Sequence, residues 1–225
     1  MRSQQIVRMA AGAVVALGAV VVAGMMNSSP RLEAQEQRDQ AEATRIRTGF
    51  AIAPVHLNLD GKDRSLVGLG SYLVNAVGGC DDCHSISEYA DGRNPYFSQP
   101  KKIDPSDYLG GGVDFGPLVP GSPDIVSRNL TPDKTGLPEG GHTFAEFRQI
   151  MRTGIDLDHL HPSCSATVTT DCLPAPFDGS RLQIMPWPLY QNWTDHDLQA
   201  VYEYLRAIPC FAGPPAPSPL HNDCN

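Results

Sequence analysis

The sequence predicts a loop-rich domain built from short helices. Three stretches, near residues 66–77, 144–153 and 195–208, repeat apolar residues at the three- and four-residue spacing of an amphipathic helix. The 21 glycines and 20 prolines among 225 residues favour short helices joined by long turns over a continuous sheet. A chain of this length can bury one core of ordinary size.

The first 34 residues, 1–34, have the pattern of an export segment. Arg2 and Arg8 form a positively charged start, and an uninterrupted apolar run extends from Met9 to Met26, as in a secretory signal peptide. This run is slightly shorter than the about 20 residues that span a bilayer, so an uncleaved anchor and membrane association through the N-terminus stay open. Both alternatives predict a periplasmic protein or one at the extracytoplasmic face of the membrane.

Residues 35–64 are predicted as a linker followed by an extended segment. Residues 35–47 are polar and charged, without an apolar period, which predicts a solvated linker and leaves a brief helix open. The stretch 49–60 is more apolar and contains Pro54, so we expect it to lie extended across the surface of the domain.

The first predicted helix runs from about Leu66 to Val77. Ser65 is a suitable N-cap residue. Gly68 and Gly70 weaken the helix locally but permit another helix to approach closely. Its apolar face consists of Leu66, Leu69, Leu73, Ala76 and Val77.

The most informative motif follows at Cys80-Asp81-Asp82-Cys83-His84. The spacing C-x-x-C-H is typical of covalent c-type haem attachment. Residues three and four apart share one face of a helix, so both thiols and the imidazole can meet a flat ligand together. Cys80 and Cys83 would form thioethers with the haem vinyl groups, and His84 would bind the iron. The sequence contains no second C-x-x-C-H, which predicts one haem c per chain.

Two other interpretations of the motif remain open. A redox-active dithiol expects a βαβ context, which the sequence does not show. Structural zinc requires four Cys or His ligands, usually as two paired clusters. The only plausible complement is His159 and His161 with Cys164, about 75 residues away.

Two further helices are predicted after a long irregular stretch. Residues 89–141 are rich in glycine and proline, and a bound haem would give such loops something to wrap around. Thr143 and Glu146 form a capping box before a helix over 144–153. Thr194 caps a last helix over 195–208, which Pro209 ends.

The four remaining cysteines are an even number, as expected for disulfides in an oxidising compartment. Three pairings are possible, and proximity in sequence favours Cys164–Cys172 and Cys210–Cys224. The first would close a loop inside an irregular insert, 155–182. The second would clip the tail, 211–225, back to the end of the last helix.

Met185 is the candidate for the second iron ligand. It directly precedes the two prolines of Ile184-Met185-Pro186-Trp187-Pro188, which stiffen the segment. The alternative is that this methionine only fills space in the core. Met151 is a rival methionine on a helix face. Alternatively, one of four histidines would bind the iron together with His84: His142, His159, His161 or His196. Trp187, Tyr190 and Trp193 are candidates to pack on the haem or bond a propionate, although such residues ordinarily pack in the core.

A resemblance to a known family rests on these motifs in order. Asn129-Leu130-Thr131-Pro132-Asp133-Lys134-Thr135-Gly136 resembles the N-[IL]-T-P-D-x-x-T-G stretch of cytochrome c subunits of bacterial alcohol and aldehyde dehydrogenase complexes. The pattern F-x-x-x-M-R-T-G at 147–154 and Met185-Pro186-x-x-x-Tyr190 continue the match, which covers residues 65–210.

The resemblance implies an all-α cytochrome c fold of class I, with about three to five short helices around one covalently bound haem. It implies Cys80 and Cys83 as thioether sites, His84 and Met185 as iron ligands, and Asn129 as a further candidate for haem contact. It also implies that the first and last helices of the domain cross near the haem. The chain departs from these subunits in having one haem motif, where many have three, and in its insert at 155–182.

These features predict an exported monohaem electron carrier rather than an enzyme. It would pass single electrons from a periplasmic donor, such as a dehydrogenase, to a respiratory acceptor. The sequence shows no acid–base pair or nucleophile motif, and its net charge of −8 argues against nucleic acid as a partner. The alternative is a haem sensor or haem enzyme with an open iron site, in which Met185 does not bind the iron.

Overall fold

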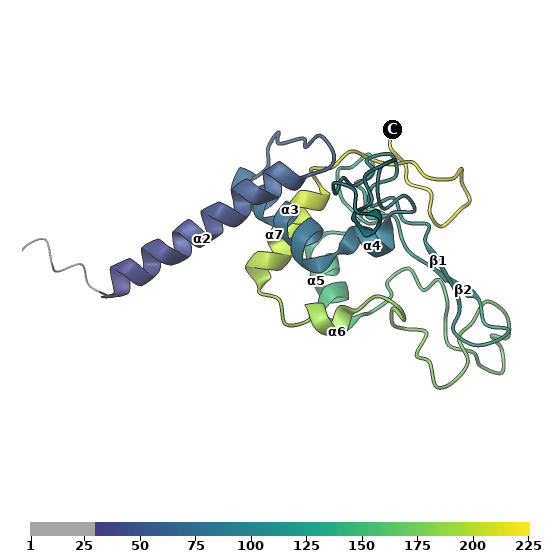
Figure 1. The fold of residues 1–225 in the computed structure, drawn as a ribbon. Coiled ribbons are helices and arrows are strands. Elements are labelled where there is room, and N and C mark those ends of the chain that lie inside the picture. The colour runs from purple at the N-terminus through teal and green to yellow at the C-terminus, as the bar shows by residue number, and fades with distance from the viewer. Residues whose placement is uncertain (1–29) are drawn as a thin grey trace, which may run out of the picture. The chain divides into compact units, whose positions relative to one another are not determined.

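The computed structural model describes residues 30–225 (Figure 1). The predicted export segment therefore lies almost wholly outside the described residues. The chain forms two compact units, Met1–Ala43 and Thr44–Asn225. The described part of the first unit is the beginning of helix α2 (Pro30–Ile52), and the second unit contains every other helix and strand described.

Helix α2 is longer than the brief helix left open for residues 35–47, and it corrects the expectation that the chain is extended from residue 49. Residues 35–52 are helical, and the extended chain begins only after Ile52. The segment is rich in Ala, Glu, Gln and Arg, which favour helix without an apolar stripe. The end of the helix belongs to the second unit, where Ile46 and Phe50 pack against the core. No helix in the described part of the chain is long and apolar enough to span a membrane.

Helix α3 (Arg64–Tyr72) continues directly into the π-helix η1 (Leu73–Gly78). The N-cap is Asp63 rather than the expected Ser65, because Asp63 Oδ1 accepts the backbone N–H groups of Ser65 and Leu66 at 2.8 and 3.2 Å. The two glycines of α3 act as expected at close crossings. A Cβ on Gly70 would lie 1.9 Å from the carbonyl oxygen of Ala200, and one on Gly68 would lie 2.6 Å from the Phe50 ring.

Helices α5 (Phe144–Thr153) and α7 (Asp195–Leu205) confirm two further predictions. Both begin with a capping box, at Thr143 and Thr194, and α7 ends three residues before the expected boundary. Helix α7 packs along α3 and also contacts α5. The buried core of these helices and of η1 includes Val67, Leu69, Val74, Phe147, Leu198, Val201 and Leu205.

Five smaller elements lie in the loops. The single-turn helix α4 (Cys80–His84) carries the C-x-x-C-H motif, and α6 (Trp187–Tyr190) follows Met185. A 3₁₀ turn, η2 (Pro95–Phe97), lies in the segment between the motif and a small hairpin. This antiparallel hairpin, β1 (Asp114–Pro117) with β2 (Asp124–Val126), is the only sheet in the described residues, and the helical prediction did not include it.

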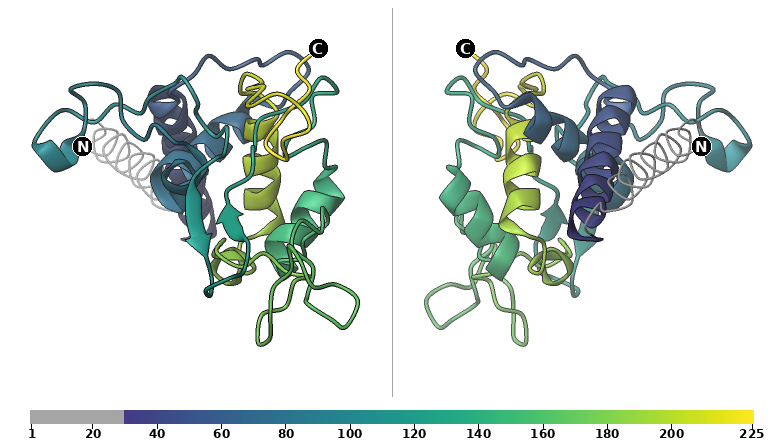
Figure 2. Two further views of the ribbon diagram at one scale, coloured as in Figure 1. Left: turned by 90° about the vertical axis from the view of Figure 1, so that its right-hand side faces the viewer. Right: turned by 90° about the vertical axis from the view of Figure 1, so that its left-hand side faces the viewer.

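The insert at 155–182 forms two loops that project away from the helices in both views of Figure 2. Isolated bridges pair Ile155 with Arg181 and Ser163 with Leu173, so the insert folds back on itself. The expected disulfide Cys164–Cys172 closes its first loop.

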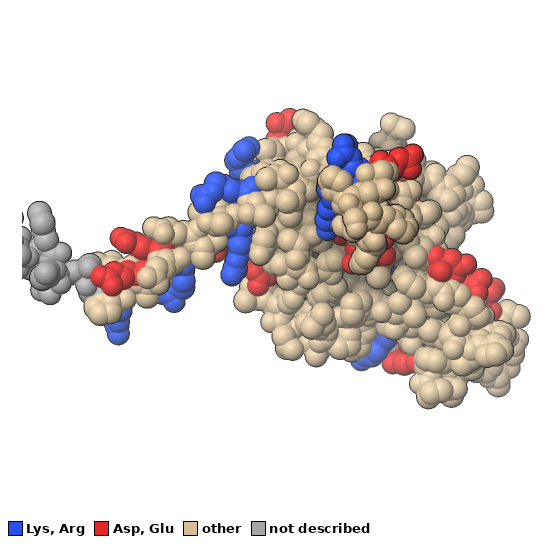
Figure 3. Space-filling model, in the orientation of Figure 1, with Lys and Arg blue, Asp and Glu red and all other residues tan. Residues whose placement is uncertain are grey.

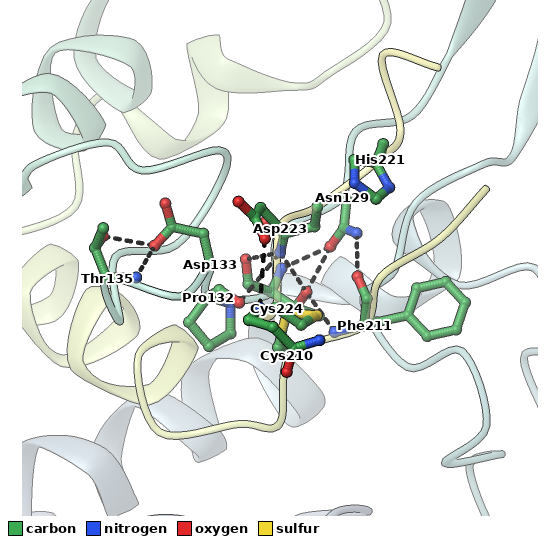
Figure 4. Close-up of a disulfide and its surroundings, with 12 residues drawn as sticks. Asn129, Pro132, Asp133, Thr135, Cys210, Phe211, His221, Asp223 and Cys224 are labelled. Carbon is green, nitrogen blue, oxygen red and sulfur yellow. Dashed lines mark hydrogen bonds between the residues drawn. A yellow bond between two sulfur atoms is a disulfide. The ribbon is translucent and has the colours of Figure 1, made fainter. Parts of the chain in front are cut away.

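The tail is fixed to the domain by the other expected disulfide, Cys210–Cys224 (Figure 4). Around it, the buried Asn222 side chain donates to the carbonyl oxygens of Thr131 and Pro132 at 3.0 and 3.1 Å. The N-L-T-P-D stretch therefore serves as the platform on which the tail is anchored.

Charged groups of both signs are scattered over the face shown in Figure 3, with wide uncharged areas between them. The structure thus presents a mixed surface on this side rather than a field of one sign.

Candidate cofactor site

Helix α4 places the motif on the wall of a cavity with a volume of about 240 Å³. Gly79 lies between η1 and α4 and caps both helices. Its backbone, with φ 57° and ψ 40°, is left-handed, a conformation that glycine adopts without strain. Cys80, Cys83 and His84 all line this cavity, and neither cysteine forms a disulfide. The structure therefore brings together the three residues that the motif predicts to act as a set.

The imidazole of His84 is oriented by a backbone carbonyl. His84 Nδ1 lies 2.7 Å from the carbonyl oxygen of Arg128. A carbonyl only accepts hydrogen bonds, so the proton is on Nδ1, and Nε2 keeps its lone pair for a ligand. Burial lowers the pKa of His84, which favours the neutral imidazole that binds metals.

The two thiols have the properties of protonated groups rather than of a reactive dithiol. Burial, reinforced by Asp81, raises the pKa of Cys80 to about 12, and burial also raises the pKa of Cys83. Redox-active cysteines instead have a lowered pKa, because the thiolate is the reactive form. For zinc, residues 30–225 contain no cluster of three or more Cys, His, Asp or Glu side chains that could hold a metal ion.

Met185 contributes to the same cavity from the segment before α6. Its side chain is partly buried against the core, and its carbonyl accepts the N–H of Trp187 at 2.8 Å. Met151 lines the cavity as well, from α5, but is only 5% exposed within the core cluster. None of the four candidate histidines, all of which the structure describes, lines this cavity.

The aromatic candidates divide into two groups. Tyr190 and Trp193 line the cavity, and the Tyr190 hydroxyl donates to the Gly78 carbonyl at 2.9 Å. Trp187 is not among the lining residues. Its Nε1 donates to the Leu182 carbonyl at 3.2 Å, and its ring packs where a Cβ on Gly154 would lie.

Asn129 is also not among the lining residues. Its Oδ1 accepts from the backbone N–H of Thr131 at 3.0 Å, and its Nδ2 donates to the Phe211 carbonyl at 2.8 Å (Figure 4). The side chain therefore holds the tail onto the domain, and the structure gives it no place in the cavity wall.

Several lining residues were not predicted from the sequence. The hairpin contributes Phe115 and Val126, and Arg128 and Glu139 line the cavity from the loops that follow. Burial raises the pKa of the Glu139 carboxyl, an effect that Arg128 opposes. For these residues, the only sequence signal of a place in the site was that Arg128 directly precedes the N-L-T-P-D stretch. Arg128 contacts His84 through its backbone carbonyl, and a sequence pattern of side chains does not reveal such a contact.

Comparison with known proteins gives distant matches to subunits of bacterial dehydrogenases. The chain is 30% identical over 145 residues to the cytochrome c subunit of the quinone alcohol dehydrogenase of Gluconacetobacter polyoxogenes, which covers 64% of this chain and 22% of that subunit. It is 28% identical over 149 residues to the cytochrome c subunit of gluconate 2-dehydrogenase of Pantoea cypripedii, with coverages of 65% and 24%. A subunit of the nicotinate dehydrogenase of Pseudomonas putida is 29% identical over 137 residues, with coverages of 59% and 8%.

No family model matches the sequence. The chain spans about a quarter or less of the length of these curated relatives. Within that part, the shared sequence makes the chain a distant relative of cytochrome c subunits of bacterial dehydrogenases.

Proposed function

We propose that this chain is an exported cytochrome c that binds one haem covalently and carries single electrons from a dehydrogenase to a respiratory acceptor. Cys80 and Cys83 form the thioethers, and His84 and Met185 bind the iron within a cytochrome c fold. The observation that carries this proposal is that all four residues line one cavity. In the same site, the His84 Nδ1 is hydrogen-bonded to the Arg128 carbonyl, which leaves Nε2 for the iron.

The chemistry of the cavity walls fits an apolar cofactor. The walls are formed mainly by aliphatic and aromatic side chains from the core helices and loops: Val74, Leu130, Phe147, Val201 and Leu205. Such walls exclude water and lower the local dielectric, which are the protein's means of tuning a bound haem. When bound, haem supplies a one-electron couple, and the chain need only hold its ligands and control access to it.

Each ligand has a distinct support in the chain. The Arg128 carbonyl fixes the tautomer and the ring orientation of His84. Met185 lies on a segment stiffened by Pro186 and Pro188. Methionine–histidine ligation raises the reduction potential relative to other axial sets, which suits a carrier between an organic donor and a respiratory chain.

The first test is spectroscopic. Pyridine haemochrome analysis of the protein, expressed with a haem maturation system, should show one covalent haem. Its ferric form should show the weak red absorption band expected for methionine–iron ligation, and its ferrous form should not bind carbon monoxide readily. Met185→Ala should abolish the band and open the iron to carbon monoxide. Met151→Leu should keep the red band, and its ferrous form should still not bind carbon monoxide readily.

The rival function is a haem sensor or enzyme with an open iron site. A wild-type protein that lacks the red band and binds carbon monoxide would establish that rival and overturn the electron-carrier proposal. A protein without covalent haem would overturn both functions.

The proposed location and partners follow from the chain's chemistry. The N-terminal export pattern and two disulfides suit an oxidising compartment outside the cytoplasm. The relatives named above are subunits of dehydrogenases, and we propose a dehydrogenase as the electron donor. Co-purification from the native membrane with a dehydrogenase subunit tests this assignment.

A further inference from the structure

The insert at 155–182 reaches the cofactor site through a pair of carboxylates. The Arg128 guanidinium donates through Nη2 to Asp156 Oδ1 and through Nη1 to Asp158 Oδ2, the latter at 2.5 Å. The Arg128 and Asp156 side chains are only 14% and 8% exposed, while that of Asp158 is 43% exposed. The Arg128–Asp156 pair is therefore largely shielded from water, whereas the Arg128–Asp158 pair is partly open to it. Both pairs join segments about 30 residues apart.

Asp156 is held in place by the insert itself. Its Oδ1 accepts the backbone N–H groups of Asp158 and His159 at 3.0 and 3.1 Å. Its own N–H donates to the Ser180 carbonyl at 2.8 Å, next to the bridge between Ile155 and Arg181. The backbone of the insert thus fixes the position of the carboxylate that accepts from Arg128.

The backbone of Arg128 is the part that faces the cofactor ligand. Its carbonyl oxygen accepts the His84 Nδ1 proton at 2.7 Å. The backbone of Gly111 passes close to the same carbonyl group, because a Cβ added at Gly111 would lie 2.5 Å from that oxygen. Arg128 therefore has one end clamped by the insert and the other end bonded to His84.

We propose that Asp156 and Asp158 are positioning residues for His84, acting through Arg128. This inference rests on the proposed function. By fixing the guanidinium, they hold the Arg128 carbonyl in the geometry that accepts the imidazole proton. A firm acceptor makes the imidazole more basic, which stabilises ferric iron and lowers the reduction potential.

The charge-conserving substitution Arg128→Lys separates position from charge. A lysine ammonium is a point charge and cannot bridge two carboxylates with the fork of a guanidinium. We expect a higher potential, with a roughly tenfold shift of the ferric–ferrous equilibrium, or about 59 mV for a one-electron couple. The His84 Nδ1 proton should also exchange faster with solvent, as measured by NMR of the reduced protein.

Three carboxylate variants complete the experiment. Asp158→Asn, at the more exposed position, should shift the potential in the same direction with the least risk to folding. Asp158→Glu, which keeps a carboxylate within reach of Arg128, should restore the wild-type potential. Asp178→Asn makes the same charge change in the same insert, at a residue paired with Arg181, and should leave the potential and the proton exchange unchanged.

Potentiometric titration of the full-length haem-loaded proteins gives distinct outcomes. If Arg128→Lys and Asp158→Asn fold and keep the wild-type potential and exchange rate, the positioning role is overturned while the proposed function stands. If Asp178→Asn shifts the potential as much as Asp158→Asn, the effect is one of charge alone and the inference is again wrong. Failure of the proposed function is recognised separately, because the wild type itself would then lack covalent haem or the red band.

Discussion

At the scale of single residues, a buried polar network fixes the helices beside the cofactor site. The Asn75 amide donates to the Ser71 carbonyl at 2.9 Å and to the Tyr204 hydroxyl at 3.2 Å. The Tyr108 hydroxyl donates to Asn75 Oδ1 at 2.5 Å and lies 3.0 Å from the Tyr204 hydroxyl. The Ser71 hydroxyl in turn donates to the Gly49 carbonyl at 2.7 Å. Each of these groups has a partner, as burial requires.

Tyr108→Phe tests this network. The change removes the donor to Asn75 Oδ1 and leaves a buried acceptor without its short bond, which should lower the free energy of unfolding by about 1–3 kcal/mol. Denaturant titration measures the loss. Tyr96→Phe is the control, because Tyr96 is 80% exposed and should change stability by less than about 0.5 kcal/mol. Equal stability for both variants would contradict a role for the network.

At the scale of elements, the crossing of α3 and α7 depends on the absence of a side chain at one position. A Cβ on Gly70 would lie 1.9 Å from the Ala200 carbonyl oxygen and 2.7 Å from Tyr204 Cβ. The first of these atoms belongs to the backbone, so no change of rotamer relieves the overlap. The helices can approach this closely only because glycine occupies the contact.

Gly70→Ala should therefore separate the two helices. We expect a loss of at least about 1–3 kcal/mol, the usual effect of overpacking, with a clear fall in the thermal midpoint. Gly92→Ala is the comparison: an added Cβ there meets nothing within 4 Å, although the left-handed backbone costs about 1–2 kcal/mol. A smaller loss for Gly70→Ala than for Gly92→Ala would show that the contact tolerates a methyl group.

The elements also show what the sequence can and cannot predict. Apolar period and capping residues located α5 and α7 closely, because these signals are local. The hairpin and the π-helical turn were missed, because three- and four-residue strands and a single wider turn leave no distinct pattern. The length of helix α2 was underestimated, because its propensity signal lacks an apolar stripe. Within the site, the motif and Met185 could be named in advance, whereas the role of Arg128 depends on a carbonyl and on carboxylates from a distant insert.

At the scale of the whole molecule, ion pairs tie together segments that are far apart in sequence. Asp195, the first residue of α7, accepts from Arg148 and Arg152 of α5 at 2.9 and 2.8 Å. These arginines hold the pKa of the Asp195 carboxyl below its usual value. Because the folded state binds this proton less readily than the unfolded chain, the pairing stabilises the fold above the usual pKa of an aspartate, and the stabilisation is lost as the pH falls through the lowered value.

Asp195→Asn should therefore flatten the acid limb of the stability profile. Below about pH 4 the wild-type thermal midpoint should fall as Asp195 becomes protonated, and the variant should fall less steeply, starting from a lower midpoint at neutral pH. The measurement is thermal unfolding by circular dichroism across this range, at low ionic strength because the contact is exposed and screened by salt. Asp124→Asn, an exposed carboxyl on the hairpin outside this contact, should keep the wild-type slope. A variant slope equal to that of wild type would mean that the acid sensitivity of the molecule arises from other carboxyls with lowered pKa values, such as Asp178 or Glu146.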